Sequence, residues 1–591
     1  MPGIERYLGV RAATSPTYSG ATGQWYFLMN LTDTFQVYGM AGPGAWPNML
    51  TDYAERVSGV HAAPNRSIVI LTRDKGADEH HQLYRMNLET MAVEALTHDL
   101  GAVHLFGAFS PDGKKFAYTS TARNGQDYDV YLMSMDTPSA RPPVLTRQGH
   151  WEVLEWTEDD RLLLREVRGN ADQALYQWDL ASGEVKRLTP DDQLAVYHDA
   201  HFASNGTLYT LTDHGRDFIN LARLDQEGHV DYLLQEAADL DTMALTRQGR
   251  LIAYSVNREG FSELHLYEVD SGARRHVQAF DDSVIFDLVF NEEGTELAVT
   301  HSGPDHNMNI ALVHLSSGEV KPLTLAPMTG LDSKQMVRPN VMRYQSFDGL
   351  SIPAHVYCPP GIGDAPVVVS VHGGPEAQER PYFSAWYQYL LAHGYAVVTP
   401  NVRGSTGYGK AYSHLDDREQ RMDSVRDIAH LVDWIQDQPG LDGSRIAIYG
   451  GSYGGFMVLS SITQYPERFR VAIDIVGIAN LESFLENTSA WRRALREVEY
   501  GYLATDREFL RRFSPIHYVD RIKTPLFVVH GANDPRVPLN EAEQIVQALK
   551  ERGREVEFCV FDDEGHGIAK LKNRLTLYPR MVDFLDRYLK D

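Results

Sequence analysis

The chain is poor in cysteine, and it has neither a long apolar run nor a basic cluster. Its two cysteines, Cys358 and Cys559, lie in strand-like segments, so we expect buried thiols and no disulfide framework. No apolar run approaches the roughly 20 residues of a membrane-spanning helix. The first residues also lack the basic start and apolar stretch of a signal peptide. These absences predict a cytoplasmic protein without a membrane partner.

Positive charge is also scarce. The chain has 55 lysines and arginines against 80 aspartates and glutamates, which gives a formal net charge of −25. Nucleic acids and anionic membranes bind basic surfaces, so this balance argues against both as partners. No cysteines and histidines have the spacing of a metal site, and the loop Asp78-Glu-His-His81 is expected to be solvated. We therefore expect neither a metal ion nor another cofactor.

The first half of the chain is repetitive. Residues 15–325 repeat a pattern of short apolar strands and glycine-containing turns at a spacing of about 40–45 residues. The clearest copies cover residues 109–146 and 289–324, and weaker copies begin near Ser15, Val57, Trp151, Tyr197 and Leu240. Copies of this length with short antiparallel strands predict a seven-bladed β-propeller. A propeller alone would be typical of a binding protein.

The pattern changes after an irregular stretch at residues 326–340, which we expect to link two domains. In residues 341–591, apolar strands alternate with segments of helical periodicity. This alternation predicts an α/β-hydrolase domain with a doubly wound, mostly parallel sheet. Residues 1–14 precede the first repeat, and we expect them to pack on the hydrolase domain.

A candidate nucleophile lies in the second domain at Ser452, within Gly450-Gly-Ser-Tyr-Gly-Gly455. A buried strand is predicted before this stretch and a helix after it. A nucleophilic serine projects from a sharp strand-to-helix turn, and glycines at positions 450, 451, 454 and 455 would remove the collisions that such a turn creates. Because Gly-x-Ser-x-Gly also arises by chance, its context has to decide.

Asp534 and His566 follow the last two predicted strands and are the candidate partners of the serine. Catalytic groups gather beyond the carboxyl ends of parallel strands. The order Ser452, Asp534, His566 is that of the α/β-hydrolase architecture. His566 would accept the serine proton, and Asp534 would orient the imidazole. Asp562 and Asp563 are rival orienters, which we rank lower because they precede the histidine in its own loop.

The stretch His372-Gly-Gly-Pro375 follows another predicted strand. Loops of this type present backbone N–H groups to an oxyanion. We assign one donor to the backbone of Gly373 or Gly374 and the other to the backbone of Tyr453. The side chain of His372 is expected to form structural hydrogen bonds.

Together these motifs resemble the prolyl oligopeptidase family of serine peptidases over the whole chain. The resemblance rests on residues 372–375, 401–409, 450–455, 534–538 and 565–567. Within the family, the chain looks most like acylaminoacyl peptidases. That implies an enzyme that forms an acyl-enzyme and releases N-acylated residues, or cuts near the N-terminus, of small peptides.

The resemblance also implies substrate-binding residues. Arg536 would reach the carbonyl oxygen one residue upstream of the cleaved residue, and the alternative is that it pairs with a nearby carboxylate. The pocket for the cleaved residue would be lined by Val476, Phe484 and Trp491, with Tyr453 beside the nucleophile; each could equally belong to the core. Residues 1–325 contain no paired glutamates of the kind that dipeptidyl peptidases in this family use to hold a free amine.

Several alternatives stay open. Within the family, the chain could be a dipeptidyl peptidase or a prolyl-type oligopeptidase. Outside it, the chain could be a carboxylesterase or a non-catalytic binding scaffold. The expected partner is a small peptide substrate, and a homo-oligomer is compatible with the sequence.

Overall fold

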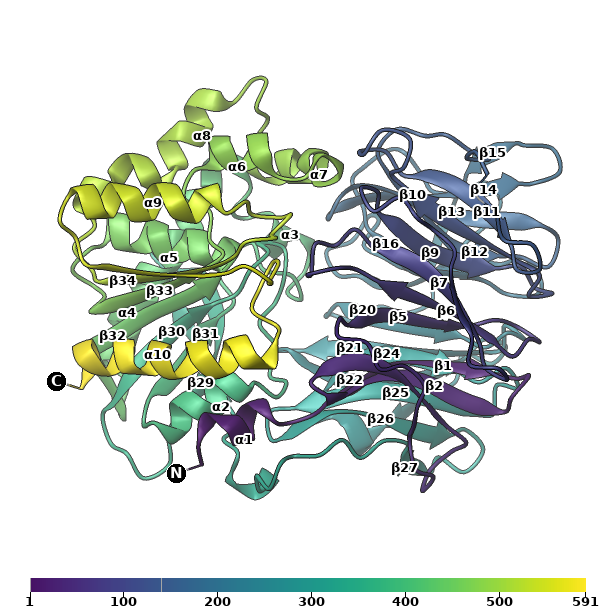
Figure 1. The fold of residues 1–591 in the computed structure, drawn as a ribbon, viewed down its shortest axis with the longest axis horizontal. Coiled ribbons are helices and arrows are strands. Elements are labelled where there is room, and N and C mark those ends of the chain that lie inside the picture. Colours follow the sequence, from purple (N-terminus) through teal and green to yellow (C-terminus); the bar gives the residue numbers. More distant parts are fainter. Residues whose placement is uncertain (1, 140, 591) are drawn as a thin grey trace.

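The computed structural model describes residues 2–139 and 141–590, which form two domains lying side by side (Figure 1). The first domain is the β-propeller that the repeat predicted. Each of its seven blades is one antiparallel sheet built from consecutive strands. In chain order the blades comprise β1 (Ala13–Ser19), β2 (Gln24–Thr32), β3 (Thr34–Met40) and β4 (Asn48–Met49); β5 (Val57–Ala62), β6 (Ile68–Arg73), β7 (Gln82–Asn87) and β8 (Val93–Ala95); β9 (His104–Phe109), β10 (Lys115–Ser120) and β11 (Asp129–Ser134); β12 (His150–Trp156), β13 (Arg161–Gly169), β14 (Asp172–Asp179) and β15 (Val185–Arg187); β16 (Tyr197–Phe202), β17 (Leu208–Thr212), β18 (Asn220–Leu224) and β19 (Val230–Tyr232); β20 (Leu240–Leu245), β21 (Leu251–Arg258), β22 (Phe261–Glu268) and β23 (Arg274–Val277); β24 (Val284–Phe290), β25 (Glu296–Gly303), β26 (His306–His314) and β27 (Val320–Pro322).

Blade 3 has one strand fewer than the other blades. Among the described residues after β11, an isolated bridge pairs Val130 with Leu145, and Val144 donates to the Val130 carbonyl oxygen at 2.9 Å. Pro142 and Pro143 precede that bridge. Proline has no backbone N–H, so this stretch cannot extend the ladder into a fourth strand.

The propeller ring is closed by side-chain packing. An apolar cluster joins blade 1 to blade 7, and it contains Trp25 and Phe27 from β2 and Ile310 and Leu312 from β26. Every propeller sheet that the structure describes is made of strands from one continuous segment, so no strand is exchanged between the first and last blades. The cohesion of the ring therefore depends on burial between neighbouring blades.

The second domain contains an eight-stranded sheet in the order β28-β29-β31-β30-β32-β33-β34-β35. The pairs β28/β29 and β29/β31 are antiparallel and the remaining pairs are parallel. These strands are β28 (Asn340–Gln345), β29 (Ser351–Tyr357), β30 (Ala365–Val371), β31 (Ala396–Pro400), β32 (Leu441–Gly451), β33 (Val471–Ile475), β34 (Leu526–Gly531) and β35 (Val556–Phe561). The predicted α/β-hydrolase fold is thus confirmed.

Helices cover both faces of this sheet. The described helices are α1 (Ile4–Leu8), α2 (Ala385–Ala392), α3 (Lys410–Ser413), α4 (Arg421–Gln436), α5 (Tyr453–Gln464), α6 (Leu481–Asn487), α7 (Ala490–Tyr500), α8 (Arg507–Phe513), α9 (Asn540–Glu551) and α10 (Leu571–Leu589), with short 3-10 turns η1 (Gln278–Phe280), η2 (Ser333–Gln335), η3 (Arg418–Gln420) and η4 (Pro515–Arg521). Helices α4, α5 and α9 share one apolar cluster with Val367 and Val369, whereas α2 and α10 share another with Val368. Successive strand residues point to opposite faces, which explains the division. Among the described residues, no helix is both long enough and apolar enough to cross a membrane.

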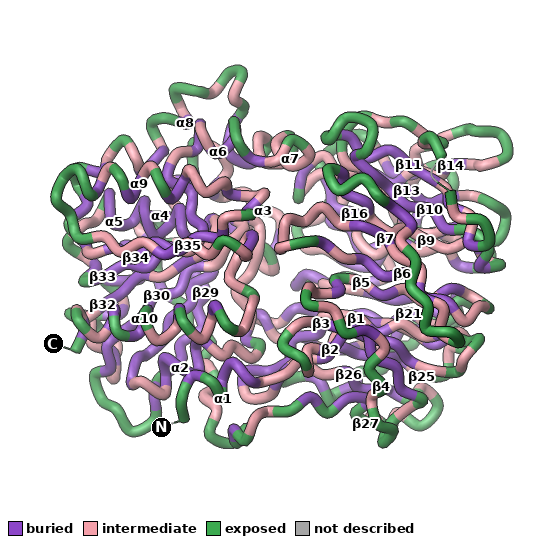
Figure 2. The backbone as a smooth tube through the Cα atoms, viewed as in Figure 1, coloured by how far each residue is buried: buried purple, intermediate pink, exposed green. Residues whose placement is uncertain are grey.

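The N-terminal helix α1 lies against α2 and α10, away from the propeller that follows it in sequence (Figure 1). Its side chains Ile4, Tyr7 and Leu8 belong to the apolar cluster on that face of the sheet. Buried backbone is concentrated along the strands of both domains, and exposed residues gather at the outer turns (Figure 2).

The two cysteines are both free, but they differ in exposure. Cys559 is buried in β35, whereas Cys358 lies just beyond β29 and is exposed. The expectation of a buried thiol is therefore wrong for Cys358, because the strand ends one residue before it.

Candidate active site

Ser452 lies at the junction of β32 and α5, in a backbone conformation with φ 59° and ψ −120°. This is a strained conformation for a residue with a side chain. Its backbone N–H donates to the carbonyl oxygen of Ile475 at 2.9 Å, which ties the corner to the neighbouring strand β33. The serine is therefore held at the carboxyl edge of the parallel sheet.

The glycines around the serine are required by space at three of the four predicted positions. A Cβ atom at Gly454 would lie 2.1 Å from the carbonyl oxygen of Val371, and one at Gly450 would lie 2.4 Å from the carbonyl oxygen of Gly454. A Cβ atom at Gly455 would lie 2.3 Å from the Asp474 carboxylate. At Gly451 the nearest atom would be 3.6 Å away, an ordinary contact, so the prediction of a collision is wrong there.

Asp534 and His566 are in contact. His566 Nδ1 lies 2.7 Å from Asp534 Oδ2. The other carboxylate oxygen, Oδ1, accepts the backbone N–H groups of Arg536 at 2.8 Å and Val537 at 3.0 Å. The aspartate is buried and each of its oxygens has a partner. The structure therefore brings together two of the three predicted catalytic side chains.

The rival carboxylate Asp563 is bound elsewhere. Its side chain pairs with Lys572 at 2.7 Å and with Lys570 at 3.2 Å, and it accepts a hydrogen bond from Asn573. The pKa of Asp563 lies far below its usual range, mainly because of the contact with Lys572. Its commitment to these groups leaves Asp534 as the carboxylate that orients the histidine.

Ser452 Oγ and His566 Nε2 do not share a hydrogen bond in the part of the chain that the structure describes. In unliganded active sites this contact is commonly long, and it tightens only when a substrate occupies the site. The order of strands β32, β34 and β35 places all three side chains at the same edge of the sheet.

The backbone of the predicted oxyanion loop lies beside the serine. A Cβ atom at Gly373 would lie 3.3 Å from Ser452 Cβ and 3.9 Å from Ser452 Oγ. Within the described residues, the backbone N–H groups of Gly373, Gly374 and Tyr453 have no hydrogen-bond acceptor. Tyr453 is the first residue of α5, where helix N–H groups lack internal acceptors. These groups are therefore free to bind an oxyanion.

The side chain of His372 supports this loop. Its Nδ1 lies 2.8 Å from the carbonyl oxygen of Gly373, and its Nε2 lies 2.9 Å from Ser405 Oγ. Burial lowers the pKa of His372, which favours the neutral imidazole. Ser405 belongs to the motif at residues 401–409, so that motif acts here as a support for the oxyanion loop.

The four candidates for the pocket of the cleaved residue do not share one environment. The side chains of Tyr453 and Phe484 are buried in the core of the hydrolase domain, and Val476 is buried beyond β33. The hydroxyl of Tyr453 donates to Asp416 Oδ2 at 3.0 Å, so it points away from the surface of the site. Trp491 instead packs with apolar residues of the propeller.

Arg536 forms an ion pair with the propeller. Its Nε donates to Glu79 Oε1 at 2.6 Å, and Glu79 belongs to the loop between β6 and β7. The prediction of a solvated loop at residues 78–81 is therefore wrong at Glu79. No sequence pattern signals this role, because only the docking of the second domain brings the loop to the site.

A cavity of about 440 Å³ lies between the two domains at this ion pair. It is lined by Arg56, Ser58, Ala77, Glu79 and His81 from the propeller and by Arg536, His566, Gly567, Ile568 and Ala569 from the hydrolase domain. Its volume falls within the range of small-molecule sites, about 300–1,000 Å³. The candidate general base therefore lines an open cleft to which both domains contribute.

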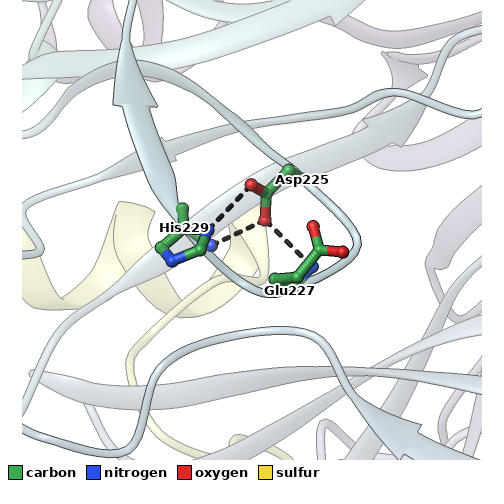
Figure 3. A group of neighbouring side chains, drawn as sticks. All are labelled: Asp225, Glu227 and His229. Carbon is green, nitrogen blue, oxygen red and sulfur yellow. Dashed lines mark hydrogen bonds and ion pairs between the residues drawn. The ribbon is translucent and has the colours of Figure 1, made fainter.

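Two groups of potential metal ligands occur in the described residues, and both are explained by other contacts. Asp225, Glu227 and His229 lie in an exposed turn, where the Asp225 carboxylate accepts backbone N–H groups and contacts the His229 ring (Figure 3). Asp416, Asp417 and Glu499 form the second group. The guanidinium of Arg421 already binds Asp416 and Glu499, so neither group points to a metal ion.

By fold and geometry the chain is an α/β-hydrolase with a serine nucleophile and a propeller facing its active edge. Residues 381–591 match the prolyl oligopeptidase family. The second domain thus carries a prolyl oligopeptidase family domain, which is a domain of serine peptidases.

Relatives of two kinds are similar to the chain. The dipeptidyl aminopeptidase BIII of Pseudoxanthomonas mexicana is 27% identical over 88% of this chain and 78% of that protein. The acylamino-acid-releasing enzyme of Arabidopsis thaliana is 32% identical over 38% of this chain and 30% of that protein. A puromycin-hydrolyzing peptidase of Mycobacterium tuberculosis shares the fold, with a TM-score of 0.87, 20% identity, and coverage of 100% of this chain and 96% of that structure.

Replacement of Gly454 by alanine is predicted to destabilise the hydrolase domain by about 1–3 kcal/mol or more, because the new methyl group would overlap the Val371 carbonyl. Chemical unfolding of the purified variant measures the change. Gly451→Ala is the matched control, since it adds the same methyl group where space exists. Equal destabilisation by both substitutions would contradict the steric argument.

Asp534→Asn is predicted to lower kcat by about 10⁴-fold, because an amide at this position favours the wrong tautomer of the catalytic imidazole. Steady-state kinetics on any substrate that the enzyme cleaves measure the loss. Asp563→Asn, a matched change in the loop of His566, is expected to keep kcat within about threefold, and a comparable loss would reverse the assignment of the orienting carboxylate.

Proposed function

We propose that the chain is a serine exopeptidase that removes an N-acylated residue from short peptides. Ser452 attacks the scissile carbonyl carbon while His566 takes the hydroxyl proton, and Asp534 holds the imidazole and stabilises its charged form. The N–H groups of Tyr453 and of Gly373 or Gly374 bind the oxyanion. The proton then passes from the histidine to the leaving amine, and water hydrolyses the acyl-enzyme by the same steps in reverse.

The interdomain cavity supports a preference for short substrates. Both the propeller and the hydrolase domain line it, so a substrate that reaches His566 has to fit between them. Folded proteins are too large for such a space.

The observation that carries the preference for a blocked N-terminus is the state of the two carboxylates beside the cavity. Glu79 is paired with Arg536, and Asp74 forms two hydrogen bonds with Arg56. Each carboxylate is therefore already neutralised by an arginine. A free substrate ammonium would have to displace one of these guanidinium groups, whereas a neutral acyl group would not.

A nearby arginine adds to this effect. Arg492 on α7 is half-buried, and burial, followed by the positive charges of Arg536 and Arg496, lowers its pKa to about 10. Burial is the larger cause of this shift, and the smaller part comes from the two neighbouring guanidinium groups, which concentrate positive charge here. That positive charge attracts carbonyl oxygens and disfavours an ammonium group, which also suits Arg536 as a ligand of the substrate carbonyl.

Dipeptidyl peptidase activity is the second candidate. The relative from Pseudoxanthomonas mexicana, a dipeptidyl aminopeptidase, is similar over most of the chain. Glu79 is the propeller carboxylate that would hold a free amine in that case. The two candidates therefore differ in the role of Glu79. In an enzyme of acylated peptides Glu79 restrains Arg536, whereas in a dipeptidyl peptidase it binds the substrate amine.

Glu79→Gln separates the two candidates. For an enzyme of blocked peptides, we expect hydrolysis of acetyl-amino-acid p-nitroanilides within about threefold of wild type, and no gain with free dipeptide p-nitroanilides. For a dipeptidyl peptidase, the same substitution should lower kcat/KM for free dipeptide substrates at least about 100-fold, the range expected for a lost charged contact. Mass spectrometry of the products identifies the bond that is cut.

Arg536→Ala is predicted to lower kcat/KM about 10- to 100-fold for acylated peptide amides, because it removes a hydrogen bond from a charged donor to the substrate carbonyl. Hydrolysis of p-nitrophenyl acetate, which has no such carbonyl, should change by less than about threefold. A uniform loss on both substrates would show that the arginine supports the structure of the site rather than the substrate.

A cytoplasmic location and any homo-oligomer also remain proposals. Cell fractionation and light scattering of the purified protein test them.

A further inference from the structure

A chain of polar contacts runs from the propeller to both candidate oxyanion donors. It begins at Asn170, in the turn between β13 and β14 of blade 4. The Asn170 amide donates to Glu376 Oε2 across the domain interface. Glu376 directly follows His372-Gly-Gly-Pro375, so this contact lies at the end of the predicted oxyanion loop.

The chain continues into the hydrolase domain. The Glu376 carboxyl lies against the Glu499 carboxyl at the end of α7. Glu499 accepts from the guanidinium of Arg421, and the same guanidinium donates to the Tyr453 hydroxyl at 3.3 Å. Tyr453 supplies the other candidate oxyanion donor through its backbone. The propeller turn is thus connected to both halves of the oxyanion site.

The propeller turn also packs directly on α7. The strand β13 contacts this helix, and a Cβ atom at Gly169 would lie 3.5 Å from the side chain of Val498. Near the start of the same helix, Trp491 packs into the apolar cluster shared by blades 3 and 4. The turn is therefore fixed against the helix that bears Glu499.

The charges along this chain balance only if a carboxyl keeps its proton. The acidic groups are Glu376, Glu499, Asp416 and Asp417, and the basic groups facing them are Arg421, Arg496 and the imidazole of His414. Burial, and then the nearby Glu499, raises the pKa of Glu376 to about 8, and burial raises that of Asp416 to about 7. His414 lies on the edge of this group, where Asp417 raises its pKa. A protonated Glu376 can donate to Glu499 while it accepts from Asn170.

We propose that Asn170 and Glu376 are positioning residues that set the oxyanion loop when blade 4 is docked on the hydrolase domain. The proposal rests on the proposed function to the extent that Ser452 is the nucleophile. It gives the propeller a part in the chemical step beyond enclosing the substrate. It also predicts that loss of the proton from Glu376 loosens the loop, since two adjacent carboxylates then repel each other.

Three variants test the role of these residues. Asn170→Ala and Glu376→Ala are expected to lower kcat about 10- to 100-fold while KM changes less than about threefold, the pattern of an interaction that matters mainly in the transition state. Glu376→Gln keeps an acceptor for Asn170 and a donor for Glu499, so it should retain at least about half of the wild-type kcat at pH 7.

The pH profile gives a readout that a merely structural role would not move. Because the raised pKa keeps Glu376 protonated below about pH 8, wild-type kcat should fall as the pH rises through that value. In Glu376→Gln, which cannot ionise, this alkaline decline should shift upward by at least one pH unit or disappear. If kcat of Glu376→Gln declined at the same alkaline pH as kcat of wild type, the proposed role of the Glu376 proton would be rejected.

Glu259→Gln is the matched control. Glu259 lies in the corresponding turn between β21 and β22 of blade 6 and contacts Arg343 of the hydrolase domain at 2.6 Å, and among the described residues its carboxylate has no hydrogen bond to His372-Gly-Gly-Pro375 or Glu376. Its kcat and pH profile should match wild type. If Asn170→Ala behaves like this control, or if its effect is confined to KM, the positioning role is refuted.

The rate at which a fluorophosphonate labels Ser452 separates this inference from the proposed function. The reagent needs only the nucleophile and the oxyanion site. Failure of the wild-type protein to be labelled would reject the serine hydrolase itself. Normal labelling of wild type with an equal rate in Asn170→Ala and Glu376→Ala would reject only the positioning role.

Discussion

The close approach of two backbone segments at Ser452 is the constraint on which the active site depends. The start of α5 packs so tightly against the end of β30 that only glycine fits at position 454. The same approach places Gly373 beside the serine and leaves its N–H without an acceptor. A strained residue of this kind costs on the order of 1–3 kcal/mol. Here the buried core around β30 and β32 offsets that cost. The close approach of α5 to β30 is thus the common cause of the strained backbone at Ser452 and of the placement of the oxyanion loop.

Much of this arrangement could be predicted from the sequence because it depends on local pattern. Alternating strands and helices indicate a parallel sheet, and residues after its strands meet at one edge, which is why Asp534 and His566 could be expected to lie together there. Glu79 and Asn170 could not be found in this way. Each lies in a polar turn of the propeller whose own blade gives it no special role. Their function depends on how the second domain docks, and no periodicity within residues 15–325 records that docking. Cys358 shows the same limit at short range, since a strand end shifted by one residue changes a buried thiol into an exposed one.

The support beneath the nucleophile is polar rather than apolar. Arg421 is 1% exposed and binds Asp416 and Glu499, which are 0% and 4% exposed. Burying such ions costs several kcal/mol each unless every group finds a partner, and an apolar replacement of similar volume is often no less stable. Stability alone therefore does not explain the network. The network instead orients Tyr453. The Tyr453 hydroxyl has three hydrogen-bond partners, Asp416, Arg421 and Ser424, and these contacts hold the first turn of α5 in place directly after Ser452.

The propeller also contacts the loop that carries the candidate catalytic histidine. A Cβ atom at Gly565 would lie 2.0 Å from the carbonyl oxygen of Ala77, so a loop of blade 2 touches the backbone directly before His566. Beyond the histidine, the Lys570 ammonium lies 3.6 Å from the carboxylate of Glu55, which belongs to the propeller. The histidine loop is thus held between Asp534 on one side and blade 2 on the other. Any movement that brings the imidazole to the Ser452 hydroxyl has to displace these propeller contacts or carry them along. The ring of blades is closed by apolar packing and by hydrogen bonds such as that from Thr14 to Asp287, so blade 2 can shift without breaking a strand pairing between blades. The distance between nucleophile and base is therefore set by both domains together.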